Sequence, residues 1–164
     1  RMDGRTFVLR YLLRRNEIYN ASMAVFRRSA LPAPEACEGF RYAGDWYFWM
    51  LVALQGRVST VFEPLNAFRR HAAATTSQGE RTGRLYEETL RILPALFARM
   101  RVAAPVRWAL EGKQLCRLHR ACRRFGWNAS YRQLWSSWCE VYRFNRLRRS
   151  WYRIYGMLPD RMFF

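Results

Sequence analysis

The chain has 164 residues and a formal net charge of +17, and 51% of its residues are hydrophobic and 16% aromatic. This apolar content excludes an intrinsically disordered chain, and the length allows one ordinary domain or a small domain with an appendage. No apolar run reaches the roughly 20 residues of a membrane-spanning helix, and no secretory signal stands at the start. Position 1 is Arg rather than Met, so we expect the chain to begin inside a longer protein.

The charge is unevenly placed. Residues 1–80 hold 11 Arg against 7 acidic residues, whereas residues 81–164 hold 17 Arg and one Lys against 5. We therefore expect two parts, 1–80 and 81–164, of which the second is drawn to anionic surfaces. The four cysteines are scattered, which is typical of reduced thiols in a cytoplasmic protein.

The first part is predicted to be an α/β fragment. Residues 20–26 are β-prone and predict a strand, and prolines and a glycine in residues 31–41 predict a loop. Gly44-Asp45 precedes a dense apolar set that ends before Gly56, which predicts a buried helix. Two further strands are expected at 58–62 and 65–68.

From Arg84 onward the spacing becomes helical, with interruptions expected at Pro94 and Pro105. A later basic helical stretch carries an aromatic stripe of Trp135, Trp138, Tyr142, Trp151 and Tyr155. This stripe suits a helix lying in a lipid interface, and it equally suits a helix packed on the rest of the protein. The second part is thus predicted to be a mainly α-helical, basic tail.

Three segments occur in a fixed order: Asn16 to Ser22 leading into Val25 to Arg28, then Gly44 to Trp49, then Glu63 to His71. Together they resemble the acceptor half of family 2 glycosyltransferases with the GT-A fold, as found in bacterial polysaccharide assembly. The resemblance covers about residues 14–77. It implies the C-terminal part of a Rossmann-like GT-A domain, without the half that binds the nucleotide.

The resemblance implies that Asp45 is the general base of an inverting transferase. A carboxylate accepts the proton of the acceptor hydroxyl as that oxygen attacks the anomeric carbon, and a helix N-terminus keeps the carboxylate ionised. The first acid of the family's acidic pair is Gly44 here. The alternative is that Asp45 is only the N-cap of the helix.

The resemblance also implies that His71 helps to hold a divalent metal, Mg or Mn, shared with the missing N-terminal half. Arg69 and Arg70 would then offset the charge of the diphosphate. The alternative is a solvated basic turn. No Asp-x-Asp pair and no Gly-rich phosphate loop occur in the sequence, so the isolated chain is expected to be inactive.

Asn16 and Asn20 are candidates to bind the acceptor or the donor sugar, against an alternative in which they satisfy loop backbone. Trp46 and Trp49 are candidates for a sugar-binding floor, because aromatic faces stack on pyranose rings, although most aromatic residues at this density should be core. Cys116, His119 and Cys122 do not predict a zinc site, since the two thiols would lie about 9 Å apart along one helix.

The expected function is therefore transfer of a sugar from a nucleotide-sugar donor to a glycan or lipid-linked acceptor in the cytoplasm, at the inner face of the membrane. The alternative is a basic module without catalysis that docks on an anionic membrane surface or binds nucleic acid. No RNP, zinc-finger or helix-turn-helix pattern supports the nucleic-acid partner.

Overall fold

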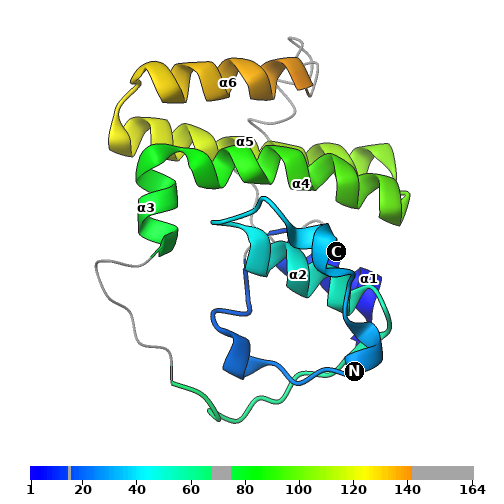
Figure 1. The fold of residues 1–164 in the computed structure, drawn as a ribbon. Helices are drawn as coiled ribbons and strands as arrows, with labels where there is room; N and C mark the ends of the chain where they lie inside the picture. The colour runs from blue at the N-terminus through cyan, green and yellow to red at the C-terminus, as the bar shows by residue number, and fades with distance from the viewer. Residues whose placement is uncertain (15, 68–74, 142–164) are drawn as a thin grey trace. The chain divides into compact units, whose positions relative to one another are not determined.

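The structure is a computed structural model that describes residues 1–14, 16–67 and 75–141 (Figure 1). The chain divides into two compact units, unit 1 at residues 1–74 and unit 2 at residues 75–164.

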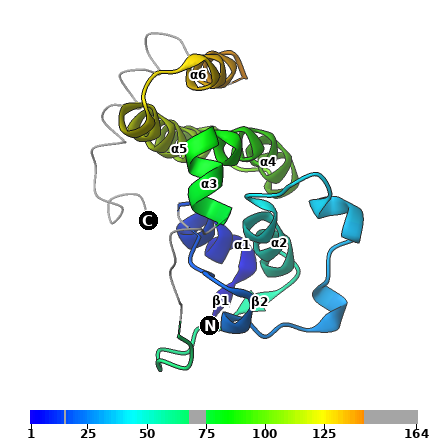
Figure 2. The ribbon, with the colours of Figure 1, turned by 60° about the vertical axis from the view of Figure 1, so that its left-hand side comes forward.

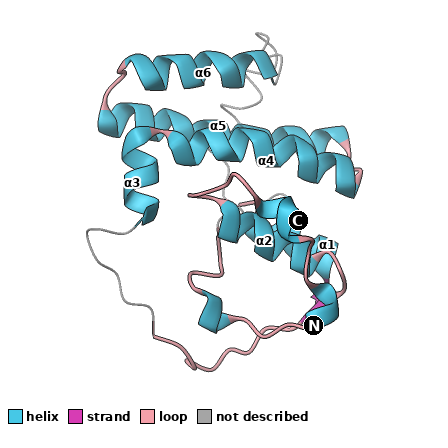
Figure 3. Cartoon of the chain, viewed as in Figure 1, coloured by secondary structure: helices cyan, strands magenta, loops and turns pink. Residues whose placement is uncertain are grey.

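Unit 1 is built from short elements around one longer helix. In chain order they are β1 (Met2–Asp3), α1 (Gly4–Phe7), the π-helical turn η1 (Val8–Leu12), the 3-10 turns η2 (Ala21–Met23), η3 (Arg28–Ala30) and η4 (Pro34–Cys37), α2 (Gly44–Ala53) and β2 (Arg57–Val58). Strands β1 and β2 pair antiparallel, with Met2 opposite Val58 and Asp3 opposite Arg57. In Figure 3 this short ladder is the only strand pairing of the described residues.

The core of unit 1 lies between α2 and the helical segment formed by α1 and η1. Its buried side chains are Phe7, Val8, Leu12 and Leu13 from the N-terminal segment and Trp46, Tyr47, Trp49, Met50 and Leu51 from α2. The N–H of Gly4 donates to the Gly56 carbonyl oxygen at 2.8 Å, and a Cβ on Gly4 would lie only 1.7 Å from the Ala53 carbonyl oxygen. The backbones of α1 and of the α2 C-terminus therefore meet where only glycine fits.

The predicted helix after Gly44 is confirmed by α2, but the predicted strands are wrong for the described residues. Residues 20–26 are an extended segment interrupted by η2, and of residues 58–62 only Val58 joins a ladder. Residues 65–67 form no strand, and residue 68 lies outside the described ranges. A β-prone run needs a neighbouring strand to satisfy its backbone groups, and the described residues of unit 1 offer these runs only the two residues of β1.

Unit 2 is helical throughout its described part. Its elements are α3 (Thr75–Thr82), α4 (Arg84–Met100), α5 (Ala104–Phe125) and α6 (Ala129–Val141). Helices α4, α5 and α6 contact one another in pairs, and α3 packs against α4 and α5. Figure 2 shows α4, α5 and α6 nearly end-on, as a three-helix bundle.

The core of unit 2 is an apolar seam shared by the three long helices. Its fully buried side chains include Ile92, Leu93, Leu96, Leu118, Cys122, Tyr131 and Trp138. Gly83 adopts a left-handed conformation (φ 79°) between α3 and α4, which lets the chain turn sharply there. The expected interruption at Pro94 is wrong, because α4 continues through this exposed proline. Burial of Ile92, Leu93 and Leu96 on the opposite side offsets the hydrogen bond that proline cannot make.

Candidate active site

Asp45 is exposed in the first turn of α2. Its carboxylate Oδ1 accepts a hydrogen bond from the backbone N–H of Trp46 at 2.6 Å. The backbone N–H groups of the first helical turn lack partners within the helix. The helix dipole is positive at this end and therefore favours a negative charge. The N-cap residue of α2 is Ala43, whose side chain cannot cap the helix. The alternative that Asp45 is the N-cap is therefore wrong, because Asp45 lies two residues further on, inside the first turn.

Gly44 stands where the family pattern has another acid, and the local packing explains the small residue. A Cβ on Gly44 would lie 3.2 Å from the Cβ of Phe40, which is tighter than an ordinary contact. Phe40 in turn packs edge-on against Tyr47 of α2, with ring centroids 5.6 Å apart. A larger residue at position 44 would therefore disturb the loop that leads into Asp45.

Of the three sequence segments that carry the family resemblance, the first contacts each of the other two in unit 1. Phe26, from the first segment, packs edge-on against Phe48 at 5.8 Å and against Trp49 at 5.7 Å between ring centroids. The side-chain amide of Asn20 donates to the Asn66 side-chain oxygen at 3.1 Å, which ties the first segment to the third. Sequence reasoning did not identify the Asn20–Asn66 bond, because nothing local links residues so far apart in the chain.

Asn16 and Asn20 both make hydrogen bonds within the protein. Asn16 accepts from the backbone N–H of Ile18 at 3.1 Å, which is a local turn of the kind that asparagine favours. The side-chain oxygen of Asn20 accepts from the Ser22 hydroxyl at 3.0 Å. Both side chains are half-buried. Asn16 thus satisfies loop backbone, which was the alternative to sugar binding.

Trp46 and Trp49 are both 6% exposed. The indole Nε1 of Trp46 donates to the Leu12 backbone oxygen at 2.7 Å, which holds α2 against the N-terminal segment. Trp49 packs edge-on against Phe48, with centroids 4.9 Å apart. The structure places both rings in the core of unit 1, and Phe48 is the half-buried aromatic residue of this helix turn.

Arg69, Arg70 and His71 lie outside the described residues. Their expected roles toward the diphosphate and the metal stay predictions. Among the residues that the structure describes, no three His, Cys, Asp or Glu side chains come together in a way that could hold a metal ion.

Cys116 and Cys122 lie on one continuous helix, α5. Burial raises the pKa of both thiols. His119 is exposed on the same helix and contacts aromatic rings rather than sulfur atoms.

The aromatic stripe expected on the last helical stretch is partly core. Trp138 and Tyr131 of α6 are fully buried, whereas Trp135 is half-buried, and the stripe residues from 142 onward lie outside the described ranges. Within α6, the packed alternative therefore holds at Trp138. Within those ranges no helix combines the length and apolar character that crossing a membrane requires.

Comparisons with protein-family models, with curated proteins and with solved structures found no match for this chain.

Proposed function

We propose that this chain is the acceptor-side part of an inverting, nucleotide-sugar-dependent glycosyltransferase of family 2. The observation that carries the proposal is the contact of the first resembling segment with each of the other two in unit 1, near a helix that exposes Asp45 on its first turn. Phe26 joins the first segment to the second, and the Asn20–Asn66 bond joins the first to the third.

In the proposed reaction, the Asp45 carboxylate takes the proton from an acceptor hydroxyl. That oxygen forms a bond to the anomeric carbon of the donor sugar, while the bond from this carbon to the diphosphate breaks and the nucleoside diphosphate leaves with the electron pair. The exposed position of Asp45 lets an acceptor reach it, and the helix N-terminus favours its charged form. The acceptor is a glycan or a lipid-linked glycan.

A divalent metal in this proposal neutralises the diphosphate, and its ligands come mainly from the half that binds the nucleotide. His71 is the contribution expected from this chain, next to Arg69 and Arg70. The described residues of unit 1 offer one exposed carboxylate at α2 and no metal cluster, which fits a base better than a metal ligand.

Exposed apolar side chains in unit 1 also support an origin in a larger α/β domain. Val25 is fully exposed and Phe62 is 96% exposed, and Leu65 and Val61 are 75% and 66% exposed. They lie in the β-prone segments that lack strand partners among the described residues. Extended segments with apolar side chains are well suited to pair with, and be covered by, the sheet of a nucleotide-binding half.

The test uses a polypeptide that carries the nucleotide-binding half together with this chain. Asp45→Asn should lower turnover by about a hundredfold or more, the usual scale of general-base catalysis, and leave the Kd of the donor unchanged. Glu35→Gln is the matched control, because Glu35 is also an exposed acid of unit 1 and should leave turnover intact. Full turnover in Asp45→Asn would refute the assignment of the base.

A further inference from the structure

Three aromatic rings meet where α5 turns into α6. His119 of α5 lies 5.9 Å from Trp127 of the connecting turn and 5.8 Å from Trp135 of α6, and the two indoles are 5.6 Å apart, all between ring centroids. His119 is exposed and Trp127 is 41% exposed. We call this group of His119, Trp127 and Trp135 the aromatic cluster. It leaves a large indole in contact with solvent at the end of a helical hairpin.

The stretch of sequence that carries the aromatic cluster is strongly basic. No acidic residue occurs between Glu111 and Glu140. The basic residues in the same stretch are Lys113, Arg117, Arg120, Arg123, Arg124 and Arg132. Arg123 lies four residues after His119 and so shares its face of α5, and Arg132 lies three residues before Trp135 on α6.

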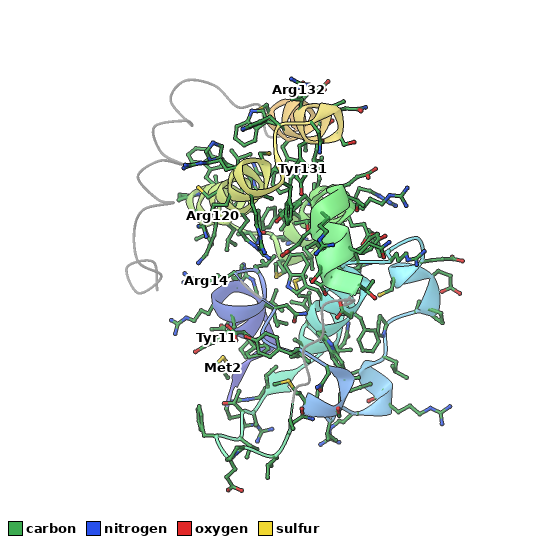
Figure 4. All side chains as sticks on the ribbon, turned by 90° about the vertical axis from the view of Figure 1, so that its left-hand side faces the viewer. Met2, Tyr11, Arg14, Arg120, Tyr131 and Arg132 are labelled. Carbon is green, nitrogen blue, oxygen red and sulfur yellow. The ribbon has the colours of Figure 1, made fainter. Side chains whose placement is uncertain are left out.

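The basic side chains near the aromatic cluster reach solvent. Arg120, Arg123, Arg124 and Arg132 are all exposed. In Figure 4, Tyr131 points from α6 toward the bundle while Arg132 lies on the outer side of the same helix, and Arg120 lies on α5. Exposed arginines on the same helix faces thus accompany an exposed indole, which is the composition of a surface that binds an anionic partner.

The sequence after α6 adds further positive charge. Residues 142–164 contain six Arg and one acidic residue, Asp160. A stretch of the chain with this excess of positive charge attracts an anionic partner of large area.

We propose that the aromatic cluster and its flanking arginines dock unit 2 on an anionic lipid bilayer. Tryptophan favours the interface of a bilayer, where its apolar ring and its N–H are both satisfied, and each basic residue adds attraction to anionic headgroups. The cluster favours lipid over single-stranded nucleic acid, because Trp127 and Trp135 pack edge-to-face at 79° and their ring planes are therefore not parallel. Successive bases need open, parallel ring faces for stacking. The proposal does not depend on the sugar chemistry of unit 1.

The test is sedimentation of the whole chain with vesicles of phosphatidylcholine, with and without phosphatidylglycerol. The chain should pellet with the anionic vesicles only, and high salt should release it. Arg123→Gln/Arg132→Gln should weaken the binding about 30-fold, from roughly fivefold for each basic residue near the surface. Arg27→Gln/Arg28→Gln is the matched control, because it removes the same charge from exposed positions of unit 1 and should change binding much less.

Trp127→Phe provides a second readout. Vesicles with brominated lipids should quench part of the tryptophan fluorescence of the bound chain, and this quenching should fall in Trp127→Phe at equal binding. Circular dichroism of each variant confirms that the helices are retained. Pelleting without the anionic lipid, equal weakening in the two arginine pairs, or unchanged quenching in Trp127→Phe would overturn the proposal. Binding to a single-stranded oligonucleotide without binding to vesicles would overturn it in favour of nucleic acid.

Discussion

The contact between Gly4 and α2 can be tested by one methyl group. In Gly4→Ala the added Cβ would lie 1.7 Å from the Ala53 carbonyl oxygen and 2.6 Å from the Gly56 carbonyl oxygen. Both acceptors are backbone atoms, so no side chain can rotate out of the way. Segment α1 must therefore move away from α2.

The cost of this movement has two parts. Overpacking of a core costs about 1–3 kcal/mol, and loss of the 2.8 Å bond from the Gly4 N–H to Gly56 leaves a buried donor without its acceptor, at about 1–3 kcal/mol. The free energy of unfolding of unit 1 should therefore fall by about 2–6 kcal/mol, which is a large share of the roughly 5–15 kcal/mol of a small domain.

Hydrogen exchange read by mass spectrometry measures the change in unit 1 separately from unit 2. Amides of α2 should exchange about 30-fold faster or more in Gly4→Ala, since each 1.4 kcal/mol is tenfold, while amides of α5 keep their rates. Gly56→Ala is the matched control, because no atom lies within 4 Å of the added Cβ. It should leave α2 unchanged or about 0.4–1 kcal/mol more stable. Equal exchange of α2 in the two variants would refute the close packing of α1.

Two further predictions concern unit 2. Trp138→Ala should lower the free energy of unfolding by about 3–5 kcal/mol in urea titrations, because the side chain is fully buried. Trp127→Ala should lower it by only about 1 kcal/mol, because this indole is 41% exposed and loses mainly its ring contacts with His119 and Trp135. Similar values for both variants would contradict the placement of α6. Burial raises the pKa of Tyr131 above its usual range, with Tyr86 adding to the effect, so the stability that this phenol contributes is complete below about pH 10 and is lost as the pH rises further. Unfolding titrations above pH 10 should show a smaller loss in Tyr131→Phe, and an unchanged slope would exclude this origin.

The helices were predictable where apolar spacing and local stop signals agree. The apolar set after Gly44 and the stop at Gly56 predict α2, and the structure has it at Gly44–Ala53. The spacing from Arg84 predicts α4, but a proline rule based on local geometry alone wrongly interrupts it, because the burial that maintains α4 through Pro94 is tertiary. The helical segment from Gly4 to Leu12 was not predicted, since so short a run depends on its contact with α2.

The strand predictions show the opposite limit. Residues 20–26 and 58–62 have β-prone composition, but a strand forms only with a partner, and composition does not say whether the partner is present. The site has the same limit. The position of Asp45 at the start of a helix follows from local signals, whereas the core position of Trp46 depends on the Leu12 carbonyl oxygen, which no spacing rule predicts.

The pairing of β1 with β2 has a consequence for how the chain folds. Met2 pairs with Val58, so the fold of unit 1 requires closure of the long loop between these residues. This closure lowers the entropy of the chain, and the cost arises before the contacts of the core can offset it. Helices α4 and α5 are neighbours in sequence and contact each other directly, so unit 2 is rich in local contacts. Local contacts form fast, and we therefore expect the helical bundle to acquire its structure ahead of the unit that carries Asp45 in refolding experiments.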